Sequence, residues 1–221
     1  FARSGSKRIK NKNLQKINGK PLLGHSINFA KKLKIVDKIF ISTDSQKISK
    51  VATKYGAIKL DRPANLSRDA SPEWKIWQYA IRQAENQYGA FDAFLTLPTT
   101  GPLRSLKDVI SAIKKLKKNT DIVITVSKSY RNPYFNVIEK KSSGKYNLVK
   151  TINKKYFEYK KESPTTYDVN TVAYVAKPSY IKRTNSIFSG KVAIQIISEE
   201  RALDIDTKFH LRVARFLYKN S

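Results

Sequence analysis

The feature that most constrains the fold is a repeated alternation of short apolar runs with longer stretches of helical periodicity. The apolar run 38–42 has the length of a buried strand, and apolar residues at helical spacing follow it until Gly56, which is typical of a helix end. The same order recurs as far as residue 126. Further strands are expected at 57–60, 94–97 and 121–126, and further helices at 72–87 and 106–116. Alternation of this kind predicts an α/β fold with a mostly parallel central sheet and flanking helices.

The pattern changes near Tyr130. Two apolar stretches, 134–139 and 146–151, flank Ser142-Ser143-Gly144, which predicts a hairpin. A polar and aromatic stretch follows, strands are expected again at 170–176 and 192–197, and Thr207 is a plausible N-cap of a last helix. We therefore expect a single domain over residues 1–221 with a small inserted β-rich arm at about 130–168.

Composition narrows the class of protein. The 221 residues suffice for one sizeable domain, and no apolar run approaches the ~20 residues that span a bilayer. We recognise no signal-peptide pattern and expect a cytoplasmic protein without a membrane partner. The absence of cysteine excludes disulfides and thiolate metal sites. Methionine is also absent and the chain starts at Phe1, so we expect that a short strand precedes Phe1 and that some spacings are a residue short, which intact mass would test.

The formal net charge of +27 has three interpretations. It could serve nucleic-acid binding, form a solvated basic surface, or attract a small polyanionic substrate such as a nucleoside triphosphate. The basic residues are scattered through every segment, and no base-stacking or groove-reading motif accompanies them. Charge alone does not decide the function, and we do not expect nucleic acid to be a partner.

The first chemical constellation spans residues 2–13. Its glycine and serines permit close approach of the backbone, while Arg3, Lys7 and Lys12 offer cations to phosphate oxygens. A solvated basic loop without a ligand is the alternative. The segment is not a Walker loop, because the Gly-Lys-Ser/Thr ending is missing.

This stretch resembles the N-terminal signature of the acylneuraminate cytidylyltransferases (CMP-sialic acid synthetases). The shared elements are Ala2-Arg3, Gly5, Ser6-Lys7 and Lys12-Asn13. The resemblance continues in order along nearly the whole chain, through Gly19-Lys20-Pro21-Leu22, Ile41-Ser42-Thr43-Asp44, Arg62-Pro63-Ala64-Asn65-Leu66, Asp69, Pro98-Thr99-Thr100, Pro102-Leu103-Arg104 and Asp204-Ile205-Asp206-Thr207. It implies a Rossmann-like nucleotidyltransferase fold and transfer of CMP from CTP to an acidic nonulosonate sugar.

The resemblance also implies a nucleotide site. Its expected nucleotide-binding residues are Arg3, Ser6, Lys7, Lys12, Asn13, Arg62 and Asp69, and its expected catalytic residues are Arg3, Lys7, Lys12 and Asp206. Arg62 and Asp69 would lie near the cytidine. Each has an ordinary alternative, because Arg62 could be a surface loop residue and Asp69 a helix cap.

Asp204 and Asp206 form the second constellation. In an extended segment both carboxylates lie on one face with Ile205 opposite, and such hard oxygen donors suit Mg²⁺. A turn followed by a helix cap is the alternative. The resemblance implies that both aspartates are magnesium ligands and that Mg²⁺ is the cofactor. The family usually carries a third acidic residue four positions after the second aspartate, where this chain has His210.

The sugar side follows from the resemblance as well. Asn170 matches an asparagine that contacts the sugar, and Lys160 or Lys161 are candidates to hold its carboxylate. Two departures from the family pattern leave the identity of the sugar undecided. Leu97 stands where relatives commonly carry Gln, and Gly101 is an insertion before Pro102 in the same loop. In the segment 132–135 an aromatic residue replaces a basic one. A modified nonulosonate is therefore as compatible as N-acetylneuraminate.

The implied reaction needs no cysteine or histidine nucleophile, since positioning and charge neutralisation supply most of the rate. A cytidylyltransferase for the eight-carbon 3-deoxy-manno-octulosonate is the nearest alternative, and a basic nucleic-acid-binding protein on the same scaffold is a remote one. Members of the family are commonly dimers through the arm. We therefore expect a homodimer with contacts at Tyr156, Phe157 and Tyr159.

Overall fold

Four strands form the central sheet of the computed structural model, which describes residues 1–68, 70–153 and 155–219. Their order is β10 (Val192–Ile196), β6 (Ile122–Lys128), β9 (Tyr167–Ala176) and β5 (Phe94–Thr96). β10 is parallel to β6, whereas β9 is antiparallel to both β6 and β5. The expected mostly parallel sheet is not confirmed, because the sheet is mixed. The chain leaves β6, makes the arm and returns directly alongside β6, which gives antiparallel pairing.

A second pair of strands lies beside the start of the chain. β3 (Phe40–Thr43) and β4 (Ile58–Asp61) are parallel, and α2 (Gln46–Lys54) connects them. The Ala2 N–H donates a hydrogen bond to the Ser42 carbonyl at 3.1 Å, so the first residues run against β3. The strands expected near 38–42 and 57–60 are thereby confirmed.

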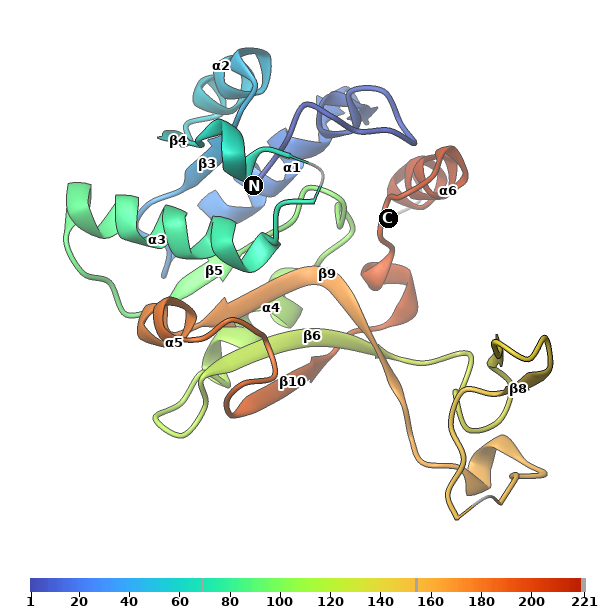
Figure 1. The fold of residues 1–221 in the computed structure, drawn as a ribbon. Helices are drawn as coiled ribbons and strands as arrows, with labels where there is room; N and C mark the ends of the chain where they lie inside the picture. Colours follow the sequence, from blue (N-terminus) through green and yellow to red (C-terminus); the bar gives the residue numbers. More distant parts are fainter. Residues whose placement is uncertain (69, 154, 220–221) are drawn as a thin grey trace.

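Helices cover both faces of the central sheet (Figure 1). Trp77 and Ile81 of α3 (Glu73–Tyr88) pack with Ile124 of β6 in a cluster that also includes residues of α5 (Pro178–Arg183). On the opposite face Val123 and its neighbours pack against α4 (Leu106–Lys114) and, further along, α1 (Leu22–Lys32). Successive side chains of β6 point to opposite faces and both faces are covered, which is why the strand begins with the uninterrupted apolar run Ile122, Val123 and Ile124.

The helix boundaries follow local capping chemistry. Ser45 accepts a hydrogen bond from the Ile48 N–H and caps α2, and Ser105 caps α4 through the Asp108 N–H. Thr207 accepts from the His210 N–H at 3.2 Å and so caps α6 (Lys208–Lys219), as the sequence predicts. Gly56, at φ +90°, follows α2, where only a glycine adopts this backbone easily.

The segment before α1 forms a tight hairpin. β1 (Lys16–Ile17) and β2 (Lys20–Pro21) are antiparallel and joined by Asn18-Gly19, both with positive φ. Two such residues give the turn that matches the natural strand twist. The 3-10 turn η1 (Lys12–Leu14) directly precedes this hairpin, so the hairpin sets the direction in which the chain leaves η1.

Residues between β6 and β9 form the arm, which projects beyond the sheet in Figure 1. It contains the expected hairpin, with β7 (Ile138–Lys140) paired to β8 (Tyr146–Leu148), and the 3-10 turn η3 (Lys160–Glu162). Two further 3-10 turns, η2 (Ala64–Leu66) and η4 (Glu199–Ala202), lie in loops. Within the described ranges, no helix is both long and apolar enough to cross a membrane.

Candidate functional site

The cationic loop near the amino end and the carboxylate pair near the carboxyl end lie together. Lys12 Nζ is 3.0 Å from Asp206 Oδ1, although 194 positions separate the two residues in the sequence. Figure 1 shows the same approach, because the loop before α1 lies beside the start of α6. Charges from both ends of the chain therefore face one site.

Buried and exposed polar contacts together hold the first loop in place. Asn13 is 7% exposed, donates from Nδ2 to the Arg3 carbonyl at 3.0 Å and accepts from Thr99 Oγ1 at 2.6 Å. The carboxylate of Asp44, at the end of β3, accepts from the Ser4 backbone N–H at 3.0 Å and from its hydroxyl at 2.7 Å. The loop is thus tied to two strand ends, which keeps its cations in a fixed arrangement.

The other expected nucleotide-binding residues lie on or beside this loop. Ser6 donates its N–H to the Ser4 carbonyl, Lys7 is exposed and Arg3 is half-buried. Arg62 donates from Nε to the Leu66 carbonyl at 2.8 Å. Desolvation lowers the pKa of Arg62, while Asp44 raises it and Arg3 lowers it further, so Arg62 lies close to the loop. Asp69 lies outside the described residues.

Asp204 and Asp206 flank a buried side chain. Ile205 is fully buried, and its N–H donates to the Thr100 carbonyl at 2.9 Å, which fixes the segment against the loop after β5. Alternation then places both carboxylates on the side away from the core. The Asp206 N–H donates to His210 Nδ1 at 3.3 Å, so the residue at the position of the family's third acid supports the backbone of the pair.

The carboxylates of Asp204 and Asp206 fit a magnesium ion whose other ligands come from water and a nucleotide. Asp204 Oδ1 is buried without a hydrogen-bond partner among the described residues, which is costly unless a ligand completes it. No group of three or more His, Cys, Asp or Glu residues suited to a metal occurs in the part of the chain that the structure describes. Two carboxylates without a full protein cage are what Mg²⁺ uses when water and phosphate supply the rest.

A bulge between β6 and β9 shapes the neighbouring wall. The register jumps between Ile124 and Val126, and the buried Thr125 hydroxyl accepts from the Ala173 N–H at 3.1 Å. Asn170 lies in this bulge at 7% exposure. Its Oδ1 accepts from the Val172 N–H, and its Nδ2 is buried without a partner in the described chain. A fixed amide with an unused donor is suited to binding a polar ligand. Sequence reasoning missed Thr125, because an irregular register has no signature in the sequence.

Tyr174 is a further residue of the site that sequence reasoning missed. Desolvation raises its pKa to about 12, and the nearby charges of Glu73 and Asp204 add to the effect. Its ring packs on Trp77 with 5.4 Å between ring centroids. The phenol therefore stays protonated at neutral pH and can donate a hydrogen bond near Asp204. Sequence reasoning missed this role because Tyr174 lies in the apolar run 172–176.

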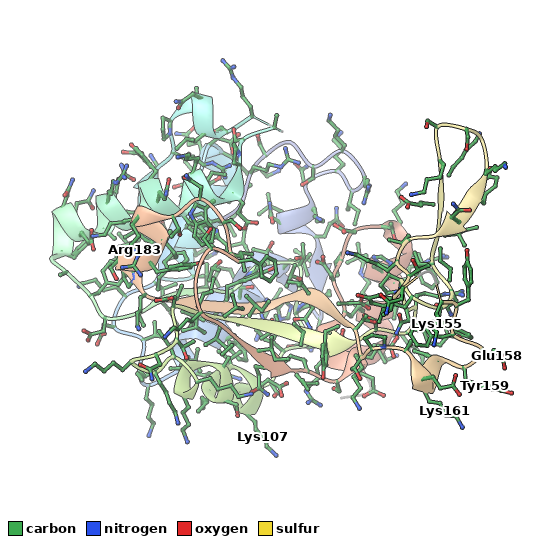
Figure 2. All side chains as sticks on the ribbon, turned by 60° about the horizontal axis from the view of Figure 1, so that its bottom comes forward. Lys107, Lys155, Glu158, Tyr159, Lys161 and Arg183 are labelled. Carbon is green, nitrogen blue, oxygen red and sulfur yellow. The ribbon has the colours of Figure 1, made fainter. Side chains whose placement is uncertain are left out.

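The two lysines expected on the sugar side lie on the arm. Lys160 Nζ donates to the Ser129 carbonyl at 2.9 Å and to the Tyr130 carbonyl at 2.6 Å. Figure 2 shows Lys161 pointing outward from the arm. Among the described residues neither lysine is hydrogen-bonded to Asn170, and their role stays a prediction.

Comparison with known proteins is consistent with this geometry. The cytidylyltransferase family model matches residues 1–203. The chain is 35% identical over 221 residues to a post-translational flagellin modification protein B of Campylobacter coli, covering 99% of this chain and 92% of that protein. It is 33% identical to a CMP-N,N'-diacetyllegionaminic acid synthase of Campylobacter jejuni (98% and 92% covered). It is 28% identical to an N-acylneuraminate cytidylyltransferase of Escherichia coli, covering 96% of this chain and 49% of that protein.

Among solved structures, the fold is similar to that of a CMP:2-keto-3-deoxy-manno-octonic acid synthetase complexed with CTP. The TM-score is 0.72 at 13% identity, with 99% of this chain and 96% of that chain covered. At this identity the likeness concerns the fold alone. The mixed α/β fold is therefore shared with that synthetase.

Proposed function

Because the chain belongs to the cytidylyltransferase family, we propose that it transfers CMP from CTP to an acidic nonulosonate sugar and releases pyrophosphate. The observation that carries the proposal is the contact between Lys12 and Asp206, which joins the cationic loop near the amino end to the pair of carboxylates near the carboxyl end. Relatives named for CMP-legionaminate synthesis and for N-acylneuraminate cytidylyl transfer support the class of sugar.

In the proposed reaction, the anomeric hydroxyl of the sugar attacks the α-phosphorus of CTP. A new oxygen–phosphorus bond forms as the hydroxyl loses its proton to solvent, the bond to the bridging oxygen breaks, and pyrophosphate leaves with that electron pair. Arg3, Lys7 and Lys12 would bind the triphosphate and offset the charge that grows on the leaving group. No covalent intermediate with the protein is required, because a correctly held hydroxyl and phosphate react directly.

We further propose that Asp204 and Asp206 hold Mg²⁺ at this site. The ion would supply positive charge next to the α-phosphate, which favours attack at phosphorus. The support comes from the chain itself, in the partnerless buried oxygen of Asp204 and the shared face of the two carboxylates. Lys12 would keep the Asp206 carboxylate oriented, and its ammonium would also reach the phosphates.

Asn170 and Tyr174 are the groups that we propose for the sugar side of the cleft. The Asn170 Nδ2 donor would orient a hydroxyl or carboxylate of the sugar, and the protonated Tyr174 phenol would donate to a neighbouring oxygen. Both lie on β9, next to residues 100–101 and the aspartate pair. The sugar would then sit between the bulge and the metal.

The arm is the part that we propose as the dimer contact. Tyr156 is 69% exposed and Tyr159 is 57% exposed, and Phe157 between them is half-buried. Large exposed aromatic side chains on a projecting segment favour burial against another protein surface. In such a homodimer Lys160 and Lys161 would lie within reach of the partner's sugar. We place the reaction in the cytoplasm.

A panel of sugar acids tests the proposed function. The protein is incubated with CTP, Mg²⁺ and, in separate reactions, N-acetylneuraminate, a legionaminate, a pseudaminate and 3-deoxy-manno-octulosonate, and pyrophosphate release is followed. We expect turnover with a nine-carbon acid and its loss in the Asp206→Asn variant. Turnover with the eight-carbon acid alone would assign the alternative substrate. The absence of pyrophosphate with every acid would refute the proposal.

A further inference from the structure

One cavity of the molecule is not lined by the residues proposed to bind the nucleotide. Its volume is about 720 Å³, and α1, residues 101–104, η4 and the end of α6 line it. None of Arg3, Lys7, Lys12, Asp204 and Asp206 is part of its lining. The size is that of a cavity that takes a small organic ligand. The proposed transfer reaction leaves this cavity unused.

The charge of the lining is strongly positive. The lining contains a single carboxylate, that of Glu200, and four cationic side chains, those of Lys20, Lys32, Arg104 and Arg201. Arg201 is also paired with Asp108 at 2.6 Å, outside the lining. Even with Asp108 counted, the cavity keeps an excess of two positive charges. A concave surface with this balance attracts anions.

Arg104 is the deepest of these cations. It is 7% exposed and donates to Ser26 Oγ at 3.1 Å and to the Pro98 carbonyl, but its buried Nε has no acceptor and no carboxylate pairs with it within the described ranges. Desolvation lowers the pKa of Arg104 to about 9, so the guanidinium is still charged at neutral pH. A buried cation without a counter-ion is unfavourable, and a bound anion would relieve it.

The local backbone is fitted to Arg104. A Cβ on Gly101 would lie 3.0 Å from Arg104 Nη2 and 3.0 Å from the Thr171 carbonyl, so a glycine at this position lets the loop close over the guanidinium. A purely structural role for Arg104 would explain its bonds to the loop. It would not explain the unused Nε or the placement of Lys20 and Lys32 around the same cavity.

Aromatic rings supply the remaining walls. The Arg104 guanidinium lies over the Phe29 ring at 5.8 Å, and the His25 ring meets Tyr218 edge-on at 4.9 Å. Burial lowers the pKa of His25, whose Nε2 bonds the Ile17 carbonyl, so this ring is neutral and adds no charge at pH 7. Cations beside aromatic faces suit a ligand that combines an anionic group with a flat ring.

We propose that this cavity is a second ligand site, which binds a small organic anion carrying a phosphate or carboxylate group on a ring. Lys20 and Lys32 would bind the anionic group at the mouth, Arg104 would lie behind it, and Phe29 and Tyr218 would pack against the ring. The proposal rests on the lining of this cavity and not on the proposed reaction or the identity of the sugar.

Calorimetric titration of the full chain at low salt tests the proposal with phenyl phosphate, benzoate and inorganic phosphate as probes. We expect phenyl phosphate or benzoate to bind, and the tighter of the two identifies the anionic group. Inorganic phosphate should bind more weakly than phenyl phosphate, because it lacks the ring. Lys32→Glu should weaken binding by about tenfold or more, since it reverses a charge beside the anion.

Lys31→Glu is the matched control, because it makes the same charge change on the adjacent residue of α1, which does not line the cavity. It should leave binding unchanged, as should Lys12→Ala in the nucleotide cleft. Lys20→Glu repeats the test if Lys32→Glu melts early. Equal losses in Lys31→Glu and Lys32→Glu, loss in Lys12→Ala, or no binding of either ring probe at millimolar concentration would overturn the proposal.

Discussion

Replacement of Lys12 by alanine separates its role in catalysis from its role in stability. Its ammonium is 3.0 Å from Asp206 Oδ1, and the two side chains are 19% and 46% exposed. Partly exposed pairs of this kind contribute at most about 1 kcal/mol to folding. Loss of one charge that acts in the transition state costs about 2–4 kcal/mol, which is a fall of about 30- to 900-fold in kcat/KM. Lys12→Ala should therefore melt almost like the wild type and turn over far more slowly.

The assay is pyrophosphate release at saturating sugar acid with varied CTP, alongside thermal unfolding of each variant. Lys10→Ala is the matched control, because Lys10 is exposed in the same loop and is two residues from Lys12. It removes the same charge and should keep kcat/KM within about threefold. Equal kinetics of the two variants would refute the argument from geometry. A large loss of stability in Lys12→Ala would refute the separation of the two roles.

Four other changes test different contacts. Asp204→Asn should reduce turnover by about 100-fold or more, the scale of a lost metal ligand, yet leave the melting temperature equal or higher, because it removes the negative charge of a carboxylate whose Oδ1 is buried without a partner in the described chain; unchanged Mg²⁺ dependence would contradict this. Thr99→Val removes the donor to Asn13 Oδ1 and should lower the free energy of unfolding in denaturant by about 1–3 kcal/mol. Burial lowers the pKa of His25 below 6.5, so the unfolded state binds the proton first and stability should fall as pH drops from about 6.5, less steeply in His25→Gln. Tyr159→Lys should shift the mass seen by light scattering from dimer towards monomer.

Periodicity predicted the elements of the fold and missed the direction of one strand. The apolar run in β9 reads like the other strands, but β9 pairs antiparallel with β6 and β5. The direction depends on how the arm returns the chain to the sheet, and this is a property of contacts far apart in sequence. α5 is six residues long and was not predicted, because so short a helix leaves little periodic signal.

The candidate site divides in the same way. The cations of the first loop and the two aspartates could be singled out from residue types and spacing, but a solvated loop and a helix cap stayed open until the family resemblance implied their roles. The contacts that hold them could not. Thr99 bonds Asn13 across 86 positions, and Thr125 fills the bulge that holds Asn170. These partners are small hydroxyl residues in apolar strands or loops, and only the folded chain brings them to the site.

The loop after β5 links the separate parts of the molecule. Thr99 donates to Asn13 and so supports the cationic loop, while the Thr100 carbonyl accepts from Ile205 between the two aspartates. Arg104 at the other end of the loop donates to the Pro98 carbonyl, the residue directly before Thr99. A shift of the guanidinium would therefore move the residue that positions the nucleotide-binding loop. An anion bound at Arg104 would act on the same hydrogen bonds, and by linkage any effect that it has on CTP affinity must equal the effect of CTP on the anion.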